Sequence, residues 1–315
     1  MHRDPALFDL ANADPETLAI NDQLERLTQA IPSPIKYGVG PLRQARAAGR
    51  GLFGPIVTGE LGQDRVIPGP AGDLGIRVFE AEKVDGVYLY FHGGGWVMGS
   101  ADGSDERLEA IARQSGVAVV SVDYRLAPEH PYPHPADDSE AAARWLIEHA
   151  SEEFGTDRIV IGGPSAGAHL AATTVLRMRD RHDFTDFAGA VYVYGFLDLG
   201  LTPSARDYGD RPLVLNTPLC HWFADAYARG ADVTDPDVSP LFADFEGHPP
   251  AFIVIGTLDP LLDDSLLLAD RLIEAGVDTD VHLSTGSAHG FTSSTVPASD
   301  RANAAIHDWI RGAVA

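Results

Sequence analysis

Gly163-Pro164-Ser165-Ala166-Gly167 stands between a β-branched run at residues 159–161 and an alanine-rich segment. Strand, sharp turn and helix in this order form the context in which a G-x-S-x-G pattern indicates a nucleophilic serine. A serine hydroxyl is a poor nucleophile at its free pKa, so it must be lifted clear of the sheet and reach a base. The pattern alone also arises by chance in chains rich in glycine and alanine. Whether Ser165 is a nucleophile therefore depends on whether the sequence also contains a suitable acid and histidine.

Strand and helix patterns alternate on both sides of this turn. Short β-branched or apolar runs predict strands, and apolar residues at helical spacing predict the helices between them. This alternation predicts an α/β fold with a mainly parallel sheet covered by helices on both faces. The strand pattern begins after residue 66. The expected strands lie near residues 76–79, 87–91, 117–122, 158–161, 190–196, 250–256 and 281–284, and the expected helices near 15–30, 41–52, 105–114, 137–149, 264–275 and 298–311.

The segment 200–247 interrupts this rhythm. It is rich in Asp, Pro and aromatic residues, has one helical pattern near 218–228, and is too long for a simple loop between consecutive elements. We therefore predict a catalytic domain formed by residues 56–199 and 248–315, with 200–247 as an insertion. Together with N-terminal helices in residues 1–55, this insertion is expected to form a lid.

The composition is that of an ordinary globular protein, with 315 residues, 44% hydrophobic and 22% charged. The formal net charge is −23 and only Lys36 and Lys83 are lysines, so no basic stripe is present to bind a nucleic-acid backbone. An acidic molecule repels anions, which favours a neutral or cationic substrate over a phosphorylated one.

The chain offers no apolar stretch of signal-peptide length near its start and no uninterrupted apolar run of about 20 residues. We therefore expect no membrane insertion and a cytoplasmic location.

Cys220 is the only cysteine, which excludes an intrachain disulfide and a cysteine-based metal site. A thiol nucleophile assisted by the adjacent His221 is disfavoured because neighbouring helical residues point in different directions.

A serine nucleophile on this sheet architecture needs an acid and a histidine, in that order, later in the chain. Asp259 follows the strand predicted at 250–256, and His289 follows the last predicted strand. The carboxyl ends of parallel strands meet at one edge of a sheet, so Ser165, Asp259 and His289 are predicted to meet there as a catalytic triad. Asp263 and Asp264 are alternative acids, but they fall where the next helix begins and suit its dipole.

The glycine loop at residues 92–96 (HGGGW) follows the strand predicted at 87–91. Consecutive glycines let a backbone approach a substrate closely and direct N–H groups at a developing oxyanion. We predict the amides of Gly93, Gly94 and Ala166 as those donors, and we expect His92 to anchor the loop by hydrogen bonds. A phosphate-binding loop is disfavoured because the Lys and Ser/Thr of that motif are missing.

Aromatic residues near these motifs are candidates for the substrate pocket. We predict that Trp96, Trp222 and Phe291 contact the substrate. Phe223 and Tyr227 share the helical pattern of the insertion with Trp222, and either an acyl pocket or packing within the lid explains all three.

His130, His134, Asp137 and Asp138 are close enough in sequence to imitate a metal cluster. Their spacing provides few carboxylates for ligation, so we expect no metal at these residues.

Five ordered motifs resemble the hormone-sensitive-lipase-like branch of the α/β-hydrolases, the bacterial family IV esterases. The similarity runs from about residue 66 to the end of the chain. It implies an α/β-hydrolase fold with an eight-stranded, mostly parallel sheet and a helical cap, hydrolysis of short- to medium-chain acyl esters, no cofactor, and a homodimer formed through an edge strand or the last helix. The motifs are residues 92–96, 123–133, 163–167, 259–261 and 289–291.

One departure from the family pattern lies at the turn itself. The family usually has Gly-Asp-Ser-Ala-Gly-Gly, whereas this chain has Pro164 before the serine and Ala168 at the last position. Proline removes a carboxylate and an N–H beside the nucleophile and fixes its φ near −65°.

These residues together predict a serine carboxylesterase acting on a small-molecule acyl ester through an acyl-enzyme intermediate. An amidase or peptidase would use the same triad. A ligand-binding protein that has lost its chemistry would keep the same fold. A lipase controlled by a lid is disfavoured because the insertion has no long apolar stretch.

Overall fold

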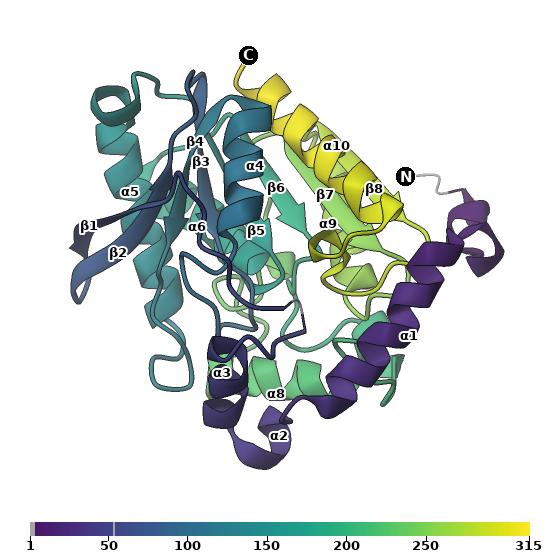
Figure 1. The fold of residues 1–315 in the computed structure, drawn as a ribbon. Helices are drawn as coiled ribbons and strands as arrows, with labels where there is room; N and C mark the ends of the chain where they lie inside the picture. The colour runs from purple at the N-terminus through teal and green to yellow at the C-terminus, as the bar shows by residue number, and fades with distance from the viewer. Residues whose placement is uncertain (1–3, 53) are drawn as a thin grey trace.

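The computed structural model describes residues 4–52 and 54–315 and contains an eight-stranded sheet (Figure 1). The spatial order of the strands is β1-β2-β4-β3-β5-β6-β7-β8. β1 and β2 are antiparallel, β2 is antiparallel to β4, and all the other neighbours are parallel. The predicted α/β fold is therefore confirmed. The strands are β1 Gln63–Gly69, β2 Gly72–Phe79, β3 Gly86–Phe91, β4 Val117–Val122, β5 Ile159–Pro164, β6 Gly189–Val193, β7 Ala251–Gly256 and β8 Thr279–Ser284.

Helices cover both faces of the sheet. α4 and α10 pack together on one face, and α5 and α6 pack together on the other. α9 packs against β7 and β8. The helices are α1 Pro15–Ala30, α2 Pro34–Tyr37, α3 Val39–Ala47, α4 Asp105–Ser115, α5 His134–Phe154, α6 Ala166–His182, α7 Pro203–Asp207, α8 Thr217–Ala228, α9 Leu262–Glu274 and α10 Pro297–Ala313, with short 3-10 turns at Pro5–Phe8, Leu10–Asn12, Pro240–Phe242 and Phe291–Ser293.

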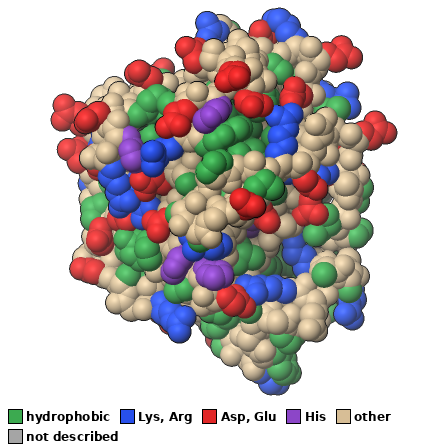
Figure 2. Space-filling view, turned by 90° about the vertical axis from the view of Figure 1, so that its left-hand side faces the viewer, with side chains coloured by type: hydrophobic (Ala, Val, Ile, Leu, Met, Phe, Trp, Pro, Cys, Tyr) green, Lys and Arg blue, Asp and Glu red, His purple; other side chains and the backbone are tan. Residues whose placement is uncertain are grey.

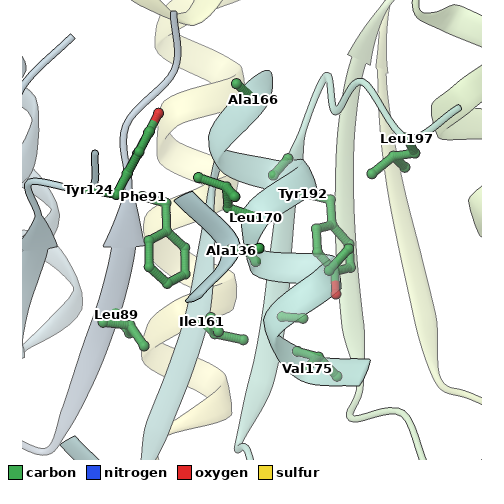
Figure 3. Close-up of a cluster of buried hydrophobic side chains, with 14 of the residues drawn as sticks. Leu89, Phe91, Tyr124, Ala136, Ile161, Ala166, Leu170, Val175, Tyr192 and Leu197 are labelled. Carbon is green, nitrogen blue, oxygen red and sulfur yellow. The ribbon is translucent and has the colours of Figure 1, made fainter. Parts of the chain in front are cut away.

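The central strand β3 shows how the sheet separates two apolar cores. All of its residues are buried, because helices cover it on both sides. Leu89 and Phe91 point into the core beneath α5 and α6, where Leu170 joins them (Figure 3). Tyr88 and Tyr90 point to the opposite core beneath α4 and α10. Side chains that alternate between the two faces thus contribute to two cores, one on each side of the sheet. Residues at the carboxyl ends of the strands are available for a functional site.

The N-terminal helices and the 200–247 segment lie at the same end of the sheet. α2 contacts α3 and α8, and Figure 1 shows these three helices below the strands, while α1 runs along the lower right of the molecule and contacts α10. Arg43 of α3 attaches this layer to the main body: it donates to the Val97 carbonyl at 2.7 Å and forms an ion pair with Glu129 at 2.8 Å. Residues 1–3 and 53 of the predicted 1–55 unit lie outside the described residues.

Several boundaries differ from those expected. The helix predicted at 137–149 extends over His134–Phe154, and the helix predicted at 41–52 is Val39–Ala47. The strand predicted at 190–196 ends at Val193, because Tyr194 takes a φ of 41° that an extended strand cannot continue through. This early end turns the chain toward the site described below.

In the part of the chain that the structure describes, no helix combines the length and apolar character needed to cross a bilayer. On the face drawn in Figure 2, acidic and basic side chains are interspersed. The negative charge of the molecule is thus distributed over this surface together with arginines.

Candidate active site

Ser165 occupies the turn between β5 and α6 with φ 56° and ψ −120°. This conformation is rare for a residue with a side chain and indicates backbone strain held by the surrounding structure. Gly163 and Gly167 pass close to the Phe91 carbonyl of β3: a Cβ would lie 2.1 Å from its oxygen at Gly163 and 1.9 Å at Gly167. The two glycines of the motif are therefore required by this close approach.

Pro164 fits this turn without losing a sheet hydrogen bond. The Ser165 N–H donates to the Val193 carbonyl at 2.8 Å, so the N–H of the preceding residue would point to the other side, toward β3. The pairing of β3 with β5 has already ended at Gly162. The missing N–H of Pro164 consequently costs no ladder bond.

Three side chains converge beside this turn. Nε2 of His289 lies 3.0 Å from Oγ of Ser165, and Nδ1 of His289 lies 2.8 Å from Oδ2 of Asp259. The other carboxylate oxygen of Asp259 accepts the Leu261 N–H at 2.9 Å. Ser165, Asp259 and His289 follow β5, β7 and β8, so the sheet topology brings them to one edge. In this arrangement the histidine can take the serine proton while the buried carboxylate holds its ring.

The two alternative acids serve other contacts. Asp263 accepts the Ser204 N–H at 2.8 Å. Asp264 is fully buried and accepts the N–H groups of Leu197 and Asp198 and the Thr202 hydroxyl. Both carboxylates thus fasten the start of the 200–247 segment to α9, and Asp259 is the acid that reaches His289.

The glycine loop lies across the turn from Ser165. An added Cβ on Gly93 would lie 3.0 Å from the Pro164 carbonyl oxygen. The N–H groups of Gly93, Gly94 and Ala166 have no hydrogen-bond acceptor among the described residues, which leaves them free to bind an oxyanion. Gly94 takes a φ of 124°, which only glycine adopts readily.

His92 lies behind the loop and supports it. Its Nδ1 lies 2.9 Å from the Gly93 carbonyl oxygen, and its ring stacks on Tyr124 with centroids 4.1 Å apart. Burial lowers the pKa of His92 to about 4, so the imidazole is neutral at pH 7. This contact is the anchoring that the sequence suggested.

A cavity of about 220 Å³ opens above Ser165. Its wall combines the catalytic-site loops with side chains from the N-terminal helices and the 200–247 segment. Apolar contacts come from Leu52, Ile56, Met98, Phe196, Val214, Leu215 and Phe223, and polar ones from Arg46, Ser100, Ser104, Arg107, Tyr194 and Ser293.

The structure corrects the three predicted substrate contacts, because none of them lines this cavity. Trp96 is fully buried and stacks on Tyr227, since its φ of 60° turns the indole beneath the loop into the core. Phe291 is buried against Tyr194. Trp222 packs beside Phe223, and it is the Phe223 ring that reaches the cavity.

Tyr194, Arg46 and Arg107 line the cavity and were missed from the sequence. The Tyr194 ring meets the edge of His289 with centroids 4.9 Å apart, and its hydroxyl lies 2.6 Å from Oγ1 of Thr292. None of the three belongs to a short motif. The sequence offered no signal for Tyr194, because the strand was expected to run on to residue 196.

Among the described residues, no group of three or more His, Cys, Asp or Glu side chains is arranged to hold a metal ion. Near His130 and His134, the two carboxylates instead pair with arginines: Asp137 with Arg177 at 2.9 Å and Asp138 with Arg125 at 2.8 Å. Burial raises the pKa of the Cys220 thiol well above its usual value, which disfavours a thiolate nucleophile.

Comparison with known proteins matches residues 88–293 to a family described as alpha/beta hydrolase fold. Esterase LipI of Mycobacterium tuberculosis is 34% identical over 319 residues, which cover 95% of this chain and 91% of that protein. Carboxylesterase NlhH of the same species is 37% identical over 235 residues, covering 70% of this chain and 71% of that protein.

Solved structures extend the likeness over nearly the whole chain. A hyperthermophilic esterase from the archaeon Pyrobaculum calidifontis has a TM-score of 0.83 and 31% identity, covering 96% of this chain and 99% of that one. An esterase from the bacterial hormone-sensitive lipase family has a TM-score of 0.82 and 29% identity, covering 96% of this chain and 100% of that one.

Proposed function

This chain belongs to the α/β-hydrolase fold family, in its branch of hormone-sensitive-lipase-like bacterial esterases, and we propose that Ser165 is the nucleophile of its hydrolytic site. The protein is a carboxylesterase. The observation that carries the assignment of residues is the chain of contacts from Asp259 through His289 to Ser165, with distances of 2.8 and 3.0 Å.

In the proposed mechanism, His289 takes the proton of the Ser165 hydroxyl as its oxygen attacks the ester carbonyl carbon. Asp259 holds the ring with Nε2 facing the serine and stabilises the imidazolium that forms. His289 then gives its proton to the alcohol oxygen, and the alcohol leaves an acyl-enzyme on Ser165. Water activated by the same histidine attacks this ester and releases the acid.

The amides of Gly93, Gly94 and Ala166 are proposed to bind the oxyanion in both steps. Ala166 begins α6, and the N-terminus of a helix favours negative charge. Backbone donors fixed by a glycine loop need no rearrangement when the charge develops, which is why such groups contribute strongly to catalysis.

We further propose that residues 1–55 and 200–247 form the cap over this site. The lining of the cavity by Arg46, Leu52, Leu215 and Phe223 supports this role. The substrate would then be a small acyl ester of short to medium chain. A cytoplasmic location and a homodimer stay predictions, with edge strand β8 and helix α10 as the candidate dimer contacts.

Replacing the nucleophile tests the assignment. Ser165→Ala should lower turnover of p-nitrophenyl butyrate by at least about 10⁴-fold, because no hydroxyl then remains to be acylated. Circular dichroism should show an unchanged fold. An active, folded Ser165→Ala protein would refute the assignment of the nucleophile.

A further inference from the structure

The cavity above Ser165 is positively charged, although the chain as a whole carries a formal charge of −23. Two arginines, Arg46 of α3 and Arg107 of α4, line it. No Asp or Glu of the described residues lines it. The charge of the residues that line the cavity is therefore opposite in sign to the net charge of the chain, so the net charge alone does not decide the charge of the substrate.

Arg46 has no carboxylate within ion-pair distance among the described residues. One of its terminal nitrogens donates to the Gly103 carbonyl at 3.4 Å, and its buried Nε has no hydrogen-bond partner in the described structure. The charge of Asp102 acts to raise the pKa of Arg46, but the Asp102 carboxylate contacts the Ser100 hydroxyl and forms no ion pair with Arg46. Burial lowers the pKa of Arg46, and the positive charge of Arg107 acts in the same direction.

Arg107 is likewise held by neutral groups. Its guanidinium donates to the Tyr90 hydroxyl at 2.8 Å and, at 3.3 Å in each case, to the hydroxyls of Ser104, Thr292 and Ser293. These oxygens accept hydrogen bonds but carry no charge. No ion pair joins Arg107 to an acidic side chain in the described part of the chain.

The two buried arginines of the described residues, Arg77 and Arg177, do have carboxylate partners. Arg77 forms an ion pair with Asp105 at 2.6 Å, and Arg177 forms one with Asp237 at 2.6 Å. Arg125 pairs with the buried Asp138 at 2.8 Å. A partly buried cation without a counter-charge is unfavourable, and two such cations near each other are more so. An anion from outside the chain would supply the counter-charge that Arg46 and Arg107 lack.

We propose that the preferred substrate is an ester carrying a carboxylate in its acyl or alcohol part, which Arg46 and Arg107 bind while the ester carbonyl lies at Ser165. This inference rests on the proposed function and specifies its substrate class. Hydrolysis itself is unchanged: the bond between acyl carbon and alcohol oxygen breaks, and water supplies the hydroxyl to the acid and the hydrogen to the alcohol. A guanidinium suits this role because its planar donors match a carboxylate.

The test compares matched charged and neutral esters. For the acyl side, these are the p-nitrophenyl half-ester of adipate and p-nitrophenyl hexanoate. For the alcohol side, they are 4-acetoxybenzoate and 4-acetoxybenzamide. The measured quantity is the ratio of kcat/KM for the charged ester to kcat/KM for the neutral one, in the wild-type protein and in Arg46→Met, Arg107→Met and Arg113→Met. Arg113 is an exposed residue of α4 whose loss changes the net charge by the same amount.

We expect the ratio to fall about tenfold or more in Arg46→Met or Arg107→Met on at least one side, and to stay within about twofold in Arg113→Met. The side affected identifies where the carboxylate binds. A smaller fall in both cavity variants, with the acyl-side pair and with the alcohol-side pair, overturns the inference.

If neither cavity variant folds, the wild-type ratio decides. A ratio above one with either pair of esters supports the inference, and a ratio below one with both pairs overturns it. Wild-type protein that hydrolyses none of the four esters contradicts the proposed function instead.

Discussion

Ser165 projects into the cavity because its own backbone accepts an unfavourable conformation. Its φ of 56° costs on the order of 1–3 kcal/mol. Two backbone hydrogen bonds hold it: the Ser165 N–H donates to Val193 at 2.8 Å, and its carbonyl accepts the His169 N–H at 3.2 Å. The surrounding strand and helix thus fix the hydroxyl where His289 can reach it, and Pro164 fits the same frame.

The acid of the proposed triad gives a test at the level of one residue. Asp259→Asn removes the charge that stabilises a protonated His289 and can favour the wrong tautomer of its ring. We expect kcat to fall by about 10³- to 10⁴-fold, with the fold retained. Initial rates with p-nitrophenyl butyrate measure this.

Asp263→Asn is the matched control. Asp263 lies four residues after Asp259 and contacts Ser204, not His289. Its effect on kcat should stay below about tenfold. Equal losses in the two variants would contradict the role given to Asp259.

Sequence motifs identified the residues that come together because each follows a strand of the sheet. They did not identify residues whose position depends on the direction in which the side chain points. Ser165, Asp259 and His289 meet because each follows a parallel strand. Trp96 stands next to the glycine loop, but its backbone directs the indole into the core. Arg46 and Arg107 are invisible to motif reasoning, because they come to the cavity from two helices far apart in the sequence.

At the scale of elements, the close packing of α6 against β3 positions the nucleophile. Gly167→Ala would place a methyl group 1.9 Å from the Phe91 carbonyl oxygen, so strand and helix would have to separate. We expect a loss of about 3 kcal/mol or more in the free energy of unfolding, measured by urea denaturation.

Gly312→Ala provides the control for this substitution. Gly312 lies in α10, is exposed, and an added Cβ there meets no atom within 4 Å. Alanine is the better helix former, so stability should stay the same or rise by up to about 1 kcal/mol. If Gly167→Ala proved as stable as Gly312→Ala, the close packing described here would be wrong.

The alternation of apolar runs was sufficient to predict the order of strands β2 to β8, because a sheet covered on both faces needs continuous apolar strands. It did not reveal β1, α2 or α7. Boundaries were less accurate where tertiary contacts decide them. The early end of β6 at Val193 depends on Tyr194 turning toward His289 and Thr292, which no local pattern reveals. The 200–247 segment was predicted to be an insertion, and the sequence did not reveal which of its residues line the cavity.

For the whole molecule, buried histidines predict how stability depends on pH. Burial lowers the pKa of His92, His169 and His248 to about 4 each, from 6.5 in the unfolded chain. Burial raises the pKa of Asp264 to about 7. Between pH 6 and 5, the unfolded chain holds nearly three histidine protons that the folded protein does not bind. The folded protein holds one proton, on Asp264, that the unfolded chain has released.

The difference of about two protons favours the unfolded state as pH falls. Stability should therefore decrease by roughly 2 kcal/mol per pH unit between pH 6 and 5. Urea denaturation at several pH values measures this slope. A free energy of unfolding that stays constant or increases from pH 6 to pH 5 would contradict the buried, neutral state of these histidines.

The net charge of the chain does not indicate the charge of the residues that line the cavity. The value of −23 belongs to the whole chain, whereas the cavity takes its sign from two arginines. The charge around a site depends on which charged side chains the fold brings together, and the amino-acid composition does not contain this information.

The central claim is that Ser165 is the residue acylated during ester hydrolysis. Treating the wild-type protein with a fluorophosphonate and analysing the digest by mass spectrometry tests it most directly. We predict one adduct per chain, on Ser165, with activity toward p-nitrophenyl butyrate lost in proportion to labelling. Full loss of activity with the adduct on another residue, or full labelling of Ser165 with activity retained, would contradict the claim.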